Sequence, residues 1–251
     1  MTGYLLLTTT LARSRVREPV GLFFALIFAP ALVLILGAIF GNEPNPDFDG
    51  RGYIDATLPA FASLVLAIIG VMLMPVNQLT LRESGALRRL RLTPLRPITF
   101  IAADLTTNFV IGMIGMATAL AVGWVAFDVS ISGNLAAVLA ASALGLLAFL
   151  ALGYTLSGLY PSSAAATGIG NILMILLMLS SGAFVPLTVM PDGVQTVMSY
   201  SPIRHFVDLI QGLWNGQAWS TLLLPTGLLL AMTIAFGALG ALLFRWDQLS
   251  R

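Results

Sequence analysis

The sequence of 251 residues contains no cysteine, no lysine and a single histidine, His205. Without cysteine, the chain can form neither a disulfide nor a thiolate metal site. Without lysine, it can contain no GxxxxGK(S/T) loop, so it cannot be its own P-loop ATPase. One histidine leaves almost no room for a catalytic or metal-binding constellation, and we interpret His205 as a surface residue on the polar side of a helix. The sequence therefore predicts no catalytic residue, no metal ligand and no cofactor bound by this chain.

Charged residues are also scarce. They make up 9% of the chain, against 58% hydrophobic residues, and the mean hydropathy is +0.94. Such a composition lies far outside that of soluble globular proteins and is typical of membrane spans. Stretches long enough to cross a hydrocarbon core of about 30 Å occur at residues 19–41, 57–77, 98–127, 135–157, 165–187 and 219–243. With no long polar block left for a soluble domain, we expect an all-α integral membrane protein with six transmembrane helices, which forms a single domain over residues 1–251.

Arginine is distributed unevenly among the polar segments. Ten of the twelve arginines lie in residues 13–17, 82–96 and 245–251, whereas acidic residues predominate in residues 42–56. The positive-inside rule places arginine-rich segments in the cytoplasm. We therefore predict a multi-pass protein of the plasma membrane with both termini on the cytoplasmic side. Residues 1–18 fit a helix that lies in the membrane interface, with leucines toward the lipid and arginines near the headgroups.

The densest arginine segment, LRESGALRRLRLTPLRP, runs from Leu81 to Pro97 and holds five of the twelve arginines. Thr80 and Glu83 have the spacing of a capping box, which predicts a cytoplasmic helix that begins near Leu81. A Thr-Pro pair should end this helix, so that it covers residues 80–93. Glu83 would serve as the cap of this helix or as a contact with another protein.

This predicted helix is amphipathic. Ala86, Leu87 and Leu90 share one face, and the arginines spread over the rest of the surface. Three interpretations compete: topology with contacts to lipid headgroups, nucleic-acid binding, and docking of a cytosolic partner. Nucleic-acid binding is disfavoured because no basic fold presents the arginines. Docking is favoured because capping, amphipathicity and the proline stop together specify a defined element, with Leu87 and Leu90 on the docking face.

The same residues resemble a known family. Arg82-Glu83-Ser84-Gly85-Ala86-Leu87-Arg88-Arg89-Leu90, followed by Thr93-Pro94-Leu95, is similar to the loop between the second and third spans of ABC type-2 exporter permeases. In that family this loop is the coupling helix, which contacts a separate ATPase subunit that binds ATP and Mg²⁺. The resemblance further implies a second permease copy or a paralogue as a partner. By this resemblance, the ATPase-coupling residues are Arg82, Glu83, Gly85, Leu87, Arg88, Arg89, Leu90 and Pro94.

The segment from Phe184 to Gln217 is too polar for a span and too apolar for a free loop. Apolar residues recur at helical spacing after a proline, and a shorter helix should precede them, starting near Pro191. The resemblance implies that residues 188–216 form two re-entrant helices, an outer lid, before the last span. Gln211 stands where family members commonly have an arginine, which leaves the family's lid salt bridge in doubt here. The predicted lid residues are Pro202, Arg204, Phe206 and Asp208, of which Arg204 and Asp208 are spaced to pair.

The resemblance implies that the second and fifth spans line a translocation path. The predicted path has no charge at mid-membrane, and its methionines suit an apolar or amphiphilic cargo, although ordinary helix packing explains each methionine equally well. The predicted path residues are Met72, Met74, Asn171, Met174, Met178 and Ser181.

Together these features predict the membrane-spanning permease subunit of an ATP-driven ABC exporter, similar to the antibiotic and multidrug branch of the family. Its cargo would be hydrophobic drug-like or lipid-like molecules, moved out of the cell. The alternatives are a membrane scaffold that transports nothing and an intramembrane enzyme. The Ser180-Ser181-Gly182 sequence favours such an enzyme only weakly, because no GxSx-type pattern accompanies it.

Overall fold

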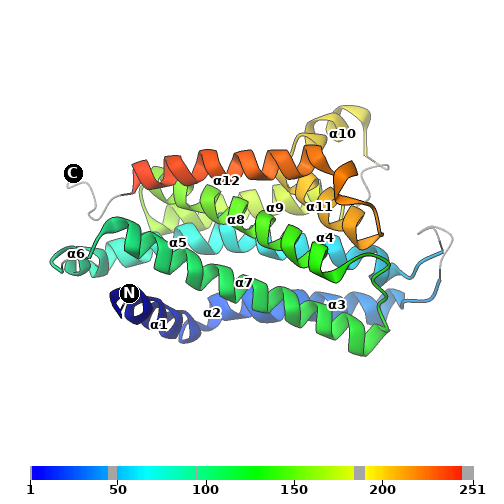
Figure 1. The fold of residues 1–251 in the computed structure, drawn as a ribbon, viewed down its shortest axis with the longest axis horizontal. Helices are drawn as coiled ribbons and strands as arrows, with labels where there is room; N and C mark the ends of the chain where they lie inside the picture. Colours follow the sequence, from blue (N-terminus) through cyan, green and yellow to red (C-terminus); the bar gives the residue numbers. More distant parts are fainter. Residues whose placement is uncertain (1, 45–49, 94, 184–189, 245–251) are drawn as a thin grey trace.

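The computed structural model of the chain describes residues 2–44, 50–93, 95–183 and 190–244 (Figure 1). These residues form helices and no strand, which confirms the expected all-α architecture. The α-helices are α1 Thr2–Val16, α2 Pro19–Leu22, α3 Phe28–Phe40, α4 Tyr53–Ile68, α5 Met74–Glu83, α6 Ala86–Arg91, α7 Pro97–Phe127, α8 Leu135–Leu159, α9 Ser163–Ser181, α10 Asp192–Ser199, α11 Pro202–Trp214 and α12 Leu223–Leu243. Two π-helical turns, η1 Phe23–Ile27 and η3 Ile69–Leu73, and one 3₁₀ turn, η5 Trp219–Thr221, complete the described elements.

Within the described residues, six helical segments are long and apolar enough to cross a membrane, as predicted, and the second and fifth differ most from the predicted bounds. The second span extends without a break from Tyr53 to Glu83, well beyond the predicted residues 57–77. The fifth span ends at Ser181 and not at residue 187, because Gly182 follows it in a left-handed conformation. The six spans are Phe23–Phe40, Tyr53–Glu83, Pro97–Phe127, Leu135–Leu159, Ser163–Ser181 and Leu223–Leu243.

A proline follows each π-helical turn. It has no N–H, so the carbonyl four residues before it, which lies in the turn, loses its helical hydrogen bond. Pro30 has no N–H to donate to Leu26, which lies in η1, and Pro75 has none for Val71, which lies in η3. The hydroxyl of Thr118 on α7 donates to the freed Leu26 carbonyl at 3.3 Å. A widened turn and a neighbouring hydroxyl therefore compensate for a proline inside a membrane helix.

The second span lies at the centre of the bundle. It is the most buried of the six spans, and it contacts α3, α7, α8, α9 and α11. Its η3 turn approaches α8 so closely that a Cβ on Gly153 would lie 2.0 Å from the carbonyl oxygen of Gly70. Glycines at this contact let the two backbones touch, as small residues commonly do between membrane helices.

The two ends of the bundle carry different short helices (Figure 1). Helices α1 and α6 lie at the end where α5 finishes and α7 begins, and α10 and α11 lie at the opposite end. Helix α1 occupies the segment predicted to lie in the membrane interface, and its Leu5 and Leu6 are exposed. The arginine-rich segment of α6 and the two helices predicted as a lid are therefore on opposite faces of the molecule.

Candidate functional site

The arginine-rich segment is organised differently from the capping-box prediction. Helix α5 continues through Thr80 to Glu83, and the Thr80 hydroxyl donates to the Val76 carbonyl within the helix at 2.9 Å, so Thr80 is not a cap. The break comes at Gly85, whose φ of 71° is a left-handed conformation that glycine adopts without steric cost. Only the six residues from Ala86 to Arg91 form the separate helix α6. The predicted start near Leu81 was wrong because packing of the second span extends its helix past the local capping signal.

The apolar side of α6 faces the interior of the protein. Leu87 is fully buried in a small cluster with Leu11, Phe100 and Ala103, and Leu90 packs against that cluster. These contacts come from α1 and α7, so they hold α6 against the bundle. The prediction that Leu87 lies on a docking face for a partner was therefore wrong, because the chain itself covers this side chain, whereas Leu90 is covered only in part.

The opposite side of α6 is exposed. Arg88 and Arg89 point away from the bundle, and Leu92, just after the helix, is 86% exposed. We call these three residues the exposed side of α6. Pro94, predicted as a coupling residue, lies outside the described residues. The surface that a partner can reach here is cationic with one apolar side chain.

Arg82 and Glu83 bind other parts of the same chain. An Arg82 Nη1 donates to the carbonyl of Ser157, near the end of α8, at 3.3 Å. The Glu83 carboxylate accepts hydrogen bonds from the backbone N–H of Ser163, at 2.7 Å, and from the Ser163 hydroxyl. The positive end of the α9 helix dipole stabilises a carboxylate at this position. Glu83 therefore caps α9 and not its own helix, and the two residues link the end of α5 to the turn between α8 and α9.

A buried polar cluster lies further along the bundle from this link. We define it as Arg15, Gln78, Asp104, Asn108 and Tyr154, which come from α1, α5, α7 and α8. An Arg15 Nη2 lies 3.1 Å from Asp104 Oδ1, and Asp104 is completely buried. Gln78 Nε2 and the Tyr154 hydroxyl both donate to Asp104 Oδ2, and Asn108 Nδ2 donates to the Asp104 carbonyl at 2.9 Å. One carboxylate thus joins α1 to the second, third and fourth spans.

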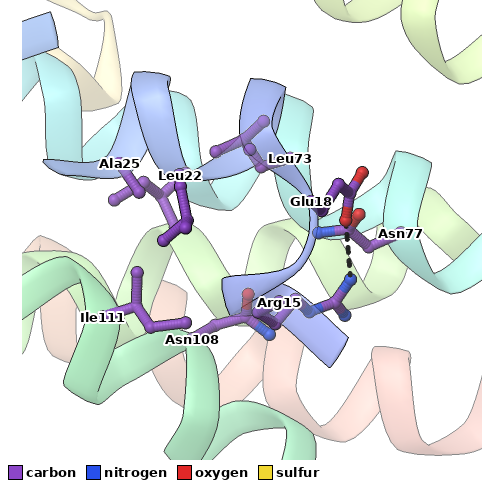
Figure 2. A pocket seen from close by; sticks show the side chains of 10 residues that line it. Arg15, Glu18, Leu22, Ala25, Leu73, Asn77, Asn108 and Ile111 are labelled. Atoms are coloured by element: carbon purple, nitrogen blue, oxygen red, sulfur yellow. Dashed lines mark ion pairs between the residues drawn. The ribbon is translucent and has the colours of Figure 1, made fainter. Parts of the chain in front are cut away.

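A small cavity lies beside this polar cluster (Figure 2). Its volume is about 20 Å³, which is close to the space that a single water occupies. Arg15 points into it, 3.9 Å from the carboxylate of Glu18, and Asn77 and Asn108 also line it. The cavity is too small to hold cargo, so the polar cluster is a joint between helices and not a transport site.

The predicted path residues fall into two groups. Met72 packs against Gly170 of α9, and Met174 and Met178 of α9 are partly buried and pack against the hydrophobic core. Met74 is fully buried, and its sulfur accepts a hydrogen bond from Asn108 at 3.6 Å. Because Met74 faces α7 inside the subunit, it does not belong with the other path residues.

Helix α9 contacts the second span and α11 with one side and leaves the other side uncovered. Asn171 lies on this uncovered side and is the predicted path residue that is exposed. Ser181 is buried at the end of the helix, where its hydroxyl donates to the Met178 carbonyl. We define the exposed face of α9 as Asn171 together with the exposed apolar residues Ile169, Ile172, Ile175, Leu176 and Leu179.

Helices α10 and α11 lie where two short helices were predicted before the last span. Helix α11 begins at Pro202, and its buried Phe206 lies against Phe149 of α8 with ring centroids 5.8 Å apart. Arg204 and Asp208 form a two-pronged ion pair, with N–O distances of 2.7 and 3.2 Å. Burial raises the pKa of the Asp208 carboxyl, and the Arg204 guanidinium acts in the opposite direction. The predicted ion pair between Arg204 and Asp208 is therefore confirmed.

Gln211 also has a defined contact. Its side-chain amide donates to the carbonyl of Ala56, at the start of the second span, at 3.2 Å. This hydrogen bond holds α11 against the second span without a salt bridge.

A comparison with known families identifies the chain. Residues 43–242 match the family described as "ABC-2 family transporter protein". The chain belongs to the ABC-2 transporter family. It is therefore the permease subunit of an ABC transporter, which is a transport subunit. Six apolar helices and its permease relatives further indicate a multi-pass protein of the plasma membrane.

Three relatives of this ABC-2 permease are bacterial. It is 30% identical over 167 residues to the putative transport permease YvfS of Bacillus subtilis (strain 168), which covers 64% of this chain and 67% of that protein. It is 30% identical over 215 residues to the inner membrane transport permease YhhJ of Escherichia coli (strain K12), covering 81% and 57%. It is 26% identical over 212 residues to the probable multidrug ABC transporter permease YbhR of the same strain, covering 81% and 55%. The permease thus spans little more than half the length of YhhJ and YbhR.

The ion pair on α11 leads to a prediction for this permease. Replacing Arg204 or Asp208 by alanine should change thermal stability little, because partly exposed ion pairs contribute only about 0–1 kcal/mol. We expect a larger effect on transport, since the pair lies on α11, one of the two helices predicted to form the lid. The measurements are the melting temperature in detergent and the ATP-dependent transport rate after reconstitution. The control is the exchanged pair Arg204→Asp with Asp208→Arg, which should recover transport. Unchanged transport in both alanine variants would remove the pair from the mechanism.

Proposed function

We propose that this ABC-2 permease is the transmembrane subunit of an ATP-driven exporter of hydrophobic drug-like or lipid-like molecules. Its partners are a separate ATPase, which binds ATP and Mg²⁺, and a second permease subunit, either an identical copy or a paralogue. The observation that carries the proposal is the double role of the arginine-rich segment. One side of α6 presents arginines to the solvent, and the residues just before it are bonded to two other spans.

This arrangement suits the transmission of a force from an ATPase. A partner bound to the exposed side of α6 pushes on a short helix that is held by the buried Leu87. The push reaches α5 through the Gly85 turn, and Arg82 and Glu83 pass it to the ends of α8 and α9. Closure of an ATPase dimer would thereby move the linked ends of the second, fourth and fifth spans together. Such a rigid-body change requires a partner that binds two states of the permease differently.

Helix α9 supports both the proposed second subunit and the proposed cargo. The exposed face of α9 is apolar except for Asn171, and it is available to a second permease. Met72 of the second span and Met174 and Met178 of α9 are partly buried, and flexible thioether side chains suit cargoes of varied shape. YbhR is named as a probable multidrug permease, which supports a drug-like cargo.

The orientation follows from the distribution of arginines. We place α1 and α6 on the cytoplasmic face, where the positive-inside rule puts arginine-rich segments, and where an ATPase has access to ATP. Helices α10 and α11 then lie on the outer face, at the opposite end of the bundle (Figure 1). A lid on the outer face would open to release cargo to the outside, so we propose export as the direction of transport.

The proposal is tested by purifying the tagged permease from its native membranes and identifying the bound proteins by mass spectrometry. We expect a P-loop ATPase to co-purify, and the reconstituted complex to move a hydrophobic dye only when ATP is hydrolysed. A scaffold would bind partners but move no dye, and an intramembrane enzyme would act without ATP. Dye movement that continues without ATP hydrolysis, or the absence of any ATPase under conditions that preserve other membrane complexes, would contradict the proposal.

A further inference from the structure

A groove lies between the beginning of α1 and the beginning of α7, away from the exposed side of α6 and from α9. Its volume is about 660 Å³, which falls within the range of about 300–1,000 Å³ that is typical of small-molecule sites. We call it the α1–α7 groove. Its lining includes the apolar side chains Leu5, Leu95, Ile98 and Ala102 and the polar side chains Arg96 and Thr99.

The polar side chains of the groove are available to a ligand. Among the residues that the structure describes, neither Arg96 nor Thr99 forms a side-chain hydrogen bond or an ion pair, and Arg96 is exposed. No carboxylate lines the groove, so it favours an anion over a cation. The first turns of α1 and α7 also border it, and the positive ends of the two helix dipoles add to the attraction for negative charge.

The rest of the groove suits a hydrocarbon chain. Leu5 and Ile98 are 58% and 62% exposed, which makes the apolar wall continuous with the surface that faces lipid. An arginine near the end of a membrane helix reaches the headgroup layer with its charged group while its stem covers apolar surface. An anion combined with a hydrocarbon chain at that depth is the chemistry of a phospholipid.

We propose that the α1–α7 groove binds an anionic phospholipid of the adjacent leaflet, with the lipid phosphate at Arg96 and Thr99 and an acyl chain along Leu5 and Ile98. The site is separate from the transport path, and it depends on membrane insertion but not on the ATPase. A bound lipid would hold the beginning of α1 against α7, while the Arg15–Asp104 ion pair joins the end of α1 to the same helix.

The experiment is native mass spectrometry of the purified full chain, titrated with phosphatidylglycerol or with zwitterionic phosphatidylcholine. We expect phosphatidylglycerol to bind at least about fivefold more tightly, since one arginine near a membrane surface contributes about that factor. Arg96→Gln should abolish this preference. Gly3→Phe should weaken the binding of both lipids by filling the groove, and it should fold normally, because a Cβ on Gly3 meets no atom within 4 Å.

The matched control is Arg88→Gln, which removes an exposed arginine that does not line the groove. It should keep the wild-type preference for phosphatidylglycerol. Equal losses in Arg96→Gln and Arg88→Gln would show diffuse attraction to positive charge and would overturn the proposal. Displacement of the lipid by millimolar inorganic phosphate would also overturn it, because the acyl chain would then contribute nothing.

Discussion

Replacing Asp104 by alanine is expected to lower the free energy of unfolding of the permease by about 3–5 kcal/mol, the usual result of removing one partner of a buried ion pair. The carboxylate of Asp104 accepts hydrogen bonds from Arg15, Gln78 and Tyr154. Its removal leaves the Arg15 cation, whose side chain is only 10% exposed, without its principal partner. A buried charge that has lost its partner costs far more than the lost bond itself.

The measurement is the unfolding of the purified subunit in detergent, combined with hydrogen exchange of α1. Exchange in α1 should increase most, because Arg15 is the residue through which α1 enters the polar cluster. The double variant Arg15→Met with Asp104→Leu is the control, since it removes both charges and should be less destabilised than Asp104→Ala. A single variant that is as stable as the double variant would show that the ion pair does not hold α1.

Reversing the charge of Arg88 and Arg89 to glutamate is expected to reduce the amount of ATPase that co-purifies by at least about tenfold, which corresponds to about 1.4 kcal/mol. Both side chains lie on the exposed side of α6 and are available to a partner. The permease itself should remain folded, because the residues that hold α6 in place are the buried leucines on its other side. The measurement is the ratio of ATPase to permease after affinity purification at two salt concentrations.

The matched control for this prediction is Arg13→Glu with Arg17→Glu. These arginines are exposed at the end of α1, so the control makes the same change of charge in another predicted cytoplasmic segment. It should retain the ATPase, and an equal loss in both double variants would point to a nonspecific effect of charge. Glu83→Ala supplies a second comparison: it should keep the ATPase but reduce the transport per ATP hydrolysed, because Glu83 is bonded to Ser163 and not to the partner.

Leu87→Asp, in contrast, cannot serve as a test of docking. Leu87 is fully buried between α1 and α7. A carboxylate there would be taken out of water without a partner, so the local fold would be lost together with any ATPase contact. From the amphipathic pattern alone, the apolar face of α6 was predicted to contact a partner, but in the structure it faces the bundle.

Local sequence patterns identified much of the end of the bundle that carries α10 and α11. Proline followed by apolar residues at helical spacing predicted α11, and the four-residue separation of Arg204 and Asp208 predicted their ion pair. Both features depend on residues within two turns of one helix, whose geometry is the same in any helix. The contact of Gln211 with Ala56 was not predictable, because its partner is 155 residues away.

The sequence by itself determined that this protein lies in a membrane, how many spans it has and that arginine is concentrated between the second and third spans. These features follow from the length of apolar stretches and from the uneven placement of few charges, which act locally. Only the tertiary structure decided which face of α6 is covered, which helix Glu83 caps and which residue neutralises Arg15. A helix pattern shows that a face is apolar, but only packing shows whether the chain or a partner covers it, and pairs such as Arg15 with Asp104 are 89 residues apart.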